Sequence, residues 1–101
     1  MSTGKANHLL TDEQQERVAL RFRVLGEPMR LRILQSVCRE PRTVTEIVKA
    51  VGATQANVSK HLSLLASVGI LSRRKAGQRV YYGMKDQLVM KLCALVHQHL
   101  E

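Results

Sequence analysis

The first run of apolar residues at helical spacing follows Thr11. Thr11 and Gln14 have the three-residue spacing of a capping box, in which each side chain bonds the other residue's backbone amide. Apolar positions follow one turn apart until Gly26, where the first helix is expected to stop. Residues 1–10 lack this periodicity, so we expect a flexible tail there and a single folded domain over residues 11–101.

Two shorter helical patterns come next, and proline and glycine delimit them. Pro28 suits the first turn of a helix, where its missing amide proton costs nothing. This second helix is expected to end near Arg39, because Pro41 prevents its continuation. A third helix is predicted from about residue 45 to 51, followed by Gly52 in a left-handed conformation.

The pattern changes after Gly69, which ends a fourth helix. Residues 70–73 and 79–82 are short β-branched or aromatic segments, and a polar loop containing glycine separates them at 75–78. That arrangement predicts a β-hairpin. A last helix is expected to begin at residues 85–86 and to carry a wide apolar stripe. The predicted fold class is therefore mainly α with a small β-hairpin.

The fourth helix, capped by Thr54 and running to about Val68, has the first candidate chemistry. Val58, Leu62 and Leu65 point to one side, and the other side is small and polar. Amides of Gln and Asn can pair with adenine edges in the major groove, while hydroxyls and Lys bond phosphates. The candidate DNA-contacting residues here are Thr54, Gln55, Ala56, Asn57, Ser59, Lys60, His61 and Ser63. When this pattern is taken alone, a merely solvated helix face explains it better than DNA binding does.

The distribution of charge favours the DNA interpretation. The chain has 16 Lys and Arg against 8 Asp and Glu, a net charge of +8, and no acidic residue lies between Glu46 and Asp86. A stretch of one sign through a helix and the hairpin after it is typical of a phosphate footprint. The candidate contacts of the hairpin are Arg73, Arg74, Lys75, Gln78 and Arg79. The alternative is that these charges only protect an edge strand.

Several other functional classes find no support in the sequence. No apolar run approaches the roughly 20 residues of a membrane span, and Met1–Asn7 has no apolar signal region. There is no Gly-rich phosphate loop, no catalytic triad spacing and no aromatic amphipathic helix for a membrane surface. We therefore expect a cytoplasmic protein that is not an enzyme, needs no cofactor and does not bind membranes.

The order of these motifs resembles the arsenic-repressor (ArsR-type) family of winged helix-turn-helix regulators. The resemblance spans residues 12–100 and is carried by LGEPMRLRIL at 25–34, NVSKHL at 57–62 with Leu65, VGIL at 68–71 and GQRVYY at 77–82. It implies a homodimeric repressor that an inducer releases from pseudo-palindromic double-stranded operator DNA. Residues 54–68 would be the recognition helix and 71–82 the wing. The first and last helices would form the dimer interface.

The last helix supports dimerisation independently of the resemblance. It has more apolar residues than one small domain can turn inward, and a patch of that kind usually marks a partner surface. These residues are Leu88, Val89, Met90, Leu92, Leu95, Val96 and Leu100. A sequence-neutral architectural DNA-binding protein is the alternative from a different class, and Gln55 and Asn57 argue against it.

The sensor is the least defined part of the sequence. The Cys-x-Cys motif of arsenic and cadmium sensors is absent, since Val44–Ile47 occupies its place. Of the zinc- and nickel-type site, Asp86 and His99 match, but Leu88 replaces a histidine ligand. A weak metal site that also uses His97 and Glu101 is one alternative.

Thiol chemistry is the hypothesis preferred for the inducer. Some relatives join a cysteine of the second helix to one of the last helix, and Cys38 and Cys93 lie on those elements, although displaced from the expected positions. A bridge would require Cα atoms within about 7 Å. Inert cysteines, or a repressor with no small-molecule sensor, remain the alternatives.

Overall fold

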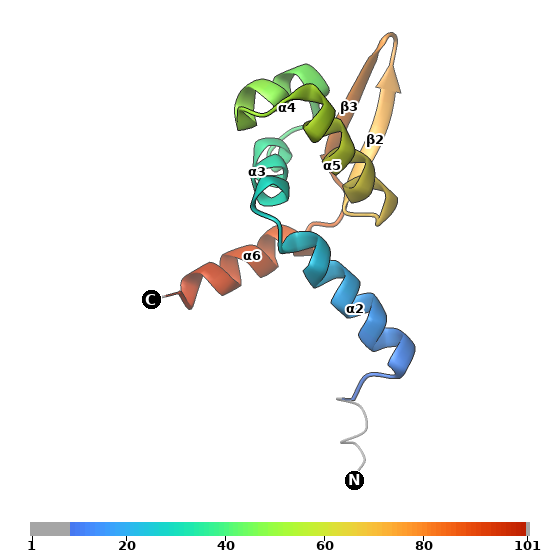
Figure 1. Cartoon of the computed structure of the whole chain (residues 1–101), viewed down its shortest axis with the longest axis vertical. Helices are drawn as coiled ribbons and strands as arrows, with labels where there is room; N and C mark the ends of the chain where they lie inside the picture. Colours follow the sequence, from blue (N-terminus) through green and yellow to red (C-terminus); the bar gives the residue numbers. More distant parts are fainter. Residues whose placement is uncertain (1–8, 101) are drawn as a thin grey trace.

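The computed structural model describes residues 9–100, and within them it contains five helices and one small sheet (Figure 1). The elements in chain order are α2 (Asp12–Leu25), α3 (Pro28–Val37), β1 (Arg42–Thr43), α4 (Val44–Val51), α5 (Gln55–Ser67), β2 (Leu71–Ala76), β3 (Arg79–Met84) and α6 (Leu88–Gln98). The expected winged helix-turn-helix architecture, mainly helical with a hairpin, is confirmed. Most of the expected tail, residues 1–8, lies outside the described residues.

Local capping explains where the first helices begin and end. Gln14 donates its backbone amide to the Thr11 hydroxyl at 3.1 Å and accepts the Thr11 amide at 2.9 Å, so the predicted capping box is confirmed. Pro28 is the first residue of α3, as expected. The carboxylate of Glu27 caps this helix by accepting the Met29 amide at 3.0 Å, a contact the sequence analysis missed. The second helix ends at Val37, two residues earlier than expected.

The next two helices form the helix-turn-helix unit. Gly52 has φ +71°, the left-handed conformation expected after α4. Thr54 caps α5 by accepting the Asn57 amide at 3.2 Å, as predicted. The start of α4 differs by one residue from the expected Thr45, because Thr43 and Glu46 form a second capping box around Val44.

The hairpin is longer than predicted and its turn is tighter. Lys75 and Ala76, assigned to the loop, pair with Val80 and Arg79, so only Gly77 and Gln78 remain as the turn. Gly77 has φ +64°, which suits the first position of a two-residue hairpin turn of type II′. The strands cover 71–76 and 79–84, rather than 70–73 and 79–82. The two-residue strand β1, which was not predicted, completes the sheet in the order β1-β3-β2.

A single apolar core joins α3, α4, α5 and the sheet, which together we call the body. The core residues are Val24, Leu25, Ile33, Leu34, Val37, Ile47, Val58, Leu62, Leu65, Ile70, Leu71, Tyr82 and Val89. The inward face expected for the fourth helix, made of Val58, Leu62 and Leu65, is completely buried. Only one end of α2 and one end of α6 contribute to this core.

The rest of α2 and α6, which we call the arms, extends away from the body in two directions (Figure 1). Phe22 on α2 is 55% exposed and Leu95 on α6 is 54% exposed. The last helix begins at Leu88 instead of residues 85–86, because Lys85 and Asp86 donate their amides to the Ile70 carbonyl. None of the helices within residues 9–100 is both long and apolar enough to span a membrane.

Candidate nucleic-acid interface

The exposed side of α5 has the small, polar surface that was expected of the fourth helix. Thr54, which caps the helix, is exposed, and Ser59 is half-buried. The remaining candidates on this side are all exposed: Gln55, Ala56, Asn57, Lys60 and Ser63. Since the apolar side is fully buried, the helix is fixed in rotation and this polar surface faces solvent. A helix of this profile can enter a major groove about 12 Å wide.

His61 differs from its neighbours because it faces another helix. Its Nδ1 accepts a hydrogen bond from Nε of Arg30 at 3.2 Å, and the ring is half-buried. Arg30 also donates from Nη1 to the Val24 carbonyl at 3.0 Å. Sequence reasoning missed Arg30. Its position in the first turn of α3, opposite the flank of α5, becomes visible only when the two helices are packed together.

The hairpin presents its basic residues to solvent beside α5. The body packs α5 against β2, and the tip of the hairpin extends beyond the helices (Figure 1). All five candidate residues of the wing are exposed: Arg73, Arg74, Lys75, Gln78 and Arg79. The guanidinium carbon of Arg74 lies 5.1 Å from the centre of the Tyr81 ring, its cross-strand partner. This cation–π contact stabilises one orientation of Arg74.

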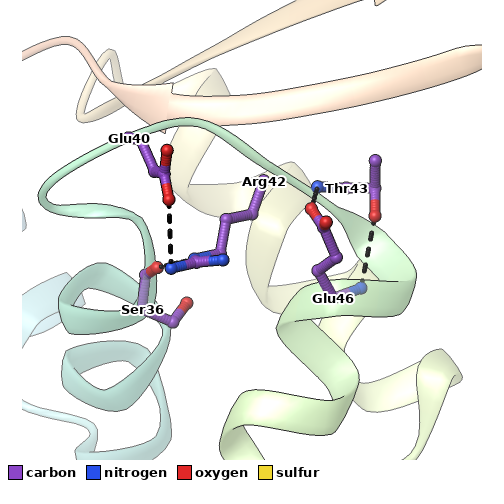
Figure 2. Close-up of polar contacts among 5 residues, drawn as sticks. All are labelled: Ser36, Glu40, Arg42, Thr43 and Glu46. Atoms are coloured by element: carbon purple, nitrogen blue, oxygen red, sulfur yellow. Dashed lines mark hydrogen bonds and ion pairs between the residues drawn. The ribbon is translucent and has the colours of Figure 1, made fainter.

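Arg42 attaches the sheet to the helices, a role that the sequence did not indicate. Its Nε donates to the Ser36 carbonyl at the end of α3 at 2.7 Å, and its Nη2 lies 3.4 Å from Glu40 (Figure 2). Because β1 pairs with β3, this contact fixes the base of the wing relative to α3.

The Thr43–Glu46 capping box lies at the same junction (Figure 2). The backbone hydrogen bond from Thr43 lowers the pKa of the Glu46 carboxyl, and the positive charges of Arg42 and Arg79 act in the same direction. Glu46 is the last acidic residue before the long basic stretch, and it lines a small pocket with Arg79 and Val80, next to the turn of the hairpin.

The two cysteines lie at opposite ends of α3. Cys93 lines an open, mostly apolar groove of about 390 Å³ with Leu25 and Leu31, near the start of that helix. Cys38 is the C-cap residue of the same helix. Seven residues separate Leu31 from Cys38, a rise of about 10 Å. Both thiols are free and half-buried.

The candidate metal ligands are dispersed from the residues just before α6 to its C-cap. Asp86 forms an ion pair with Arg21 at 3.6 Å and accepts the Leu88 amide. His97 lines the apolar groove, and His99 Nδ1 is 3.0 Å from the Leu95 carbonyl. Among residues 9–100, no three His, Cys, Asp or Glu side chains lie close enough to hold one metal ion. Glu101, the remaining candidate, lies outside the described residues.

Comparisons with known proteins agree with this architecture. Residues 27–73 match the family described as bacterial regulatory protein, arsR family. The sequence is 40% identical over 74 residues to the "probable mercury resistance operon repressor" of Streptomyces lividans, covering 73% of this chain and 59% of that protein. It is 32% identical to the "transcriptional repressor SmtB homolog" of Synechocystis, covering 88% of this chain and 67% of that protein.

The fold also resembles a solved structure over nearly its full length. The solution structure of a winged helix-turn-helix DNA-binding domain from Mycobacterium bovis, described as homodimeric, superposes with a TM-score of 0.79. The two sequences are 31% identical, and the match covers 92% of this chain and 93% of that one.

Proposed function

The chain belongs to the arsR family of bacterial regulatory proteins, and on this premise we propose that it is a transcriptional repressor that binds operator DNA as a homodimer in the cytoplasm. One observation carries the proposal. The rigidly seated α5 presents a small polar face, and the basic hairpin lies directly beside it. Neither element has an acidic residue. Such a surface suits a polyanion with readable base edges, and duplex DNA has both properties.

The proposal involves two kinds of contact with DNA, one to base edges and one to the phosphate backbone. Gln55 and Asn57, exposed in the first turn of α5, supply amide groups for base edges. The hydroxyls of α5 and Lys60 bond the phosphates on either side of the groove. The wing, with Arg73, Lys75 and Arg79, follows the backbone or enters the adjacent minor groove, where the potential favours arginine.

The arms supply the dimer interface. Phe22, Leu95 and the other exposed apolar residues of α2 and α6 form surfaces that a second copy would cover. The two ends of α2 also carry opposite charges: Asp12 and Glu13 lie in its first turn and Arg23 in its last. A two-fold axis that pairs two α2 helices antiparallel would place opposite charges together. The Mycobacterium bovis domain, which is described as homodimeric, supports dimerisation.

Binding to a natural sequence tests the proposal directly. Fluorescence anisotropy would compare a duplex from upstream of the protein's own gene with a shuffled duplex of equal composition. We expect the protein to bind the natural sequence at least about a thousandfold more tightly. We also expect one dimer, that is two chains, on each pair of half-sites. Equal affinities for the two duplexes would instead indicate a sequence-neutral architectural protein.

For the inducer, we propose a response of the cysteine thiols. Cys38 and Cys93 are free, and their half-buried side chains are within reach of small oxidants or reactive sulfur species. Since α3 separates them, each thiol would react alone or with the second copy, rather than with the other thiol of its own chain. Counting free thiols before and after peroxide or polysulfide, with DNA affinity measured in parallel, tests this. An unchanged thiol count and unchanged affinity would exclude it.

A metal response is the second candidate for the inducer, and the name of the Streptomyces relative, a probable mercury resistance operon repressor, motivates it. In this chain Asp86, His97 and His99 are too dispersed to act together, so the site would need ligands from both copies. Equilibrium dialysis against zinc and nickel, with a His97→Ala/His99→Ala variant as control, would detect such binding. Absence of stoichiometric metal would exclude this candidate.

A further inference from the structure

Arg30 connects three helices through one half-buried side chain. Its Nε donates to His61 Nδ1 on α5 at 3.2 Å, and its Nη1 donates to the Val24 carbonyl at the end of α2 at 3.0 Å. The backbone of Arg30 is itself fixed in the first turn of α3, which Glu27 caps. The side chain therefore attaches the flank of the recognition helix to the base of an arm.

We infer that Arg30 is a positioning residue for DNA recognition, acting through His61. In a neutral imidazole one ring nitrogen donates and the other accepts. Because Nδ1 accepts from Arg30, the proton must lie on Nε2. Arg30 thus fixes both the orientation and the tautomer of the ring, which leaves Nε2–H as a donor for a phosphate oxygen.

The location of His61 agrees with this role. It follows Asn57 by one helical turn, so both side chains lie on the same flank of α5. Asn57 is exposed there and His61 is half-buried. The ring can therefore contact Arg30 on its inner edge and DNA on its outer edge. The inference rests on the proposed function, since it names one of the groups through which that binding occurs.

The same side chain also joins α2, the expected dimerisation arm, to the DNA-reading helix. A change in the position of the Val24 carbonyl would alter the Arg30 side chain, and with it the donor that His61 offers. A double-mutant comparison separates this specific link from general packing, because residues that act through one another do not lose affinity additively.

Operator affinity in four variants tests the link. We expect Arg30→Met and His61→Leu each to weaken binding about tenfold, the effect of one hydrogen bond to a charged group, and the double variant to be no weaker than His61→Leu. Arg32→Met, which removes the same charge from an exposed site on α3, is the matched control and should bind nearly as tightly as the natural chain. The inference would be overturned if the affinity losses of the two single variants multiplied in the double variant. It would also be overturned if Arg32→Met lost as much affinity as Arg30→Met.

Two further variants remain informative if Arg30→Met does not fold. Arg30→Lys keeps the charge but lacks the planar fork that reaches both acceptors, so it should bind as weakly as Arg30→Met. His61→Gln can accept from Arg30 through its oxygen and donate through its amide, so it should retain affinity within about threefold. Weak binding by His61→Gln together with normal binding by Arg30→Lys would overturn the inference.

Imidazole ¹⁵N spectra of the full chain without DNA separate this inference from the proposed function. We expect an unprotonated, hydrogen-bonded Nδ1 for His61, a signal that shifts in Arg30→Met and stays unchanged in Arg32→Met. A signal that is the same in all three proteins would overturn the Arg30–His61 link. If the link is present but no duplex binds the natural chain, the proposed function fails, and the positioning role is overturned with it.

Discussion

The body and the arms have the same kinds of apolar residues but use them differently. In the body, isoleucine, leucine and valine side chains from four elements are enclosed by one another. In the arms, side chains of the same kind are left exposed, for example 40% at Val18 on α2 and 54% at Leu95 on α6. The difference indicates that the body is stabilised within one chain, whereas the arms lack the partner that would cover them. In the proposed repressor, DNA reading and dimerisation would therefore reside in separate parts of a small protein.

The largest expected effect comes from the core of the body. Ile33 on α3 is fully buried, so Ile33→Ala removes packed methyl groups and leaves a cavity. We expect a loss of about 2–5 kcal/mol in the free energy of unfolding. Urea denaturation at a fixed protein concentration measures it. Leu31→Ala, two residues earlier on the same helix but 39% exposed, is the matched control and should lose less than about 1 kcal/mol. Similar losses at both positions would contradict the contrast between enclosed and exposed apolar side chains.

The arms are best tested by placing a charge on their exposed surface. Leu95→Asp should leave the body folded but separate the two copies, because a buried carboxylate in the interface is costly. Losing the second half-site should weaken operator binding about hundredfold. Analytical ultracentrifugation and anisotropy measure the two effects. Gln98→Asp, which adds the same charge near the exposed end of α6, should remain dimeric. A Leu95→Asp variant that stays dimeric would show that another surface makes the interface.

Much of the fold could be predicted from the sequence because its signals are local. Thr11, Gly52 and Thr54 act on backbone groups within one turn, and those contacts occur as predicted. The strand β1 has only two residues, too few to show alternation, and it exists because Arg42 and Thr43 pair with β3. The hairpin was predicted too short because Lys75 and Ala76 are polar or small, although their pairing partners keep them in the sheet.

In the candidate interface, too, the features set by local sequence could be predicted, and those set by tertiary packing could not. Helical periodicity was enough to predict most of the exposed residues of α5, but the predicted contacts Ser59 and His61 are half-buried. The contact between Arg30 and His61 spans 31 positions, and the stacking of Arg74 on Tyr81 depends on the strand register. Interactions of this kind follow from tertiary packing, and a pattern of neighbouring residues does not determine them.

Within the body, α5 and the wing should respond differently to substitution. Gln55→Ala and Asn57→Ala should each reduce discrimination between the operator and a shuffled duplex by about 1–3 kcal/mol per lost base contact. Arg79→Ala should weaken binding to both duplexes alike and lower the salt slope by about one unit. Anisotropy titrations between 50 and 200 mM salt distinguish these outcomes. Uniform changes in all three variants would show that the division between base reading and backbone contact is wrong.

The smallest expected effect lies at Glu46, where α4 meets the start of β3 next to the hairpin turn. The capping contacts with Thr43 lower the pKa of this carboxyl in the folded state. A lowered folded-state pKa means that the stabilisation is fully present above the pKa of the unfolded chain and is lost as the pH falls through the folded value. Glu46→Gln keeps a side-chain oxygen for the Thr43 amide but removes the charge. Urea denaturation from pH 7 down to pH 3 should therefore show the natural chain slightly more stable near neutrality, with the two proteins converging in acid. Glu16→Gln, an exposed carboxylate in the middle of α2, controls for the loss of one negative charge. A difference between the natural chain and Glu46→Gln that persists at pH 3 would mean that the ionised cap is not its source.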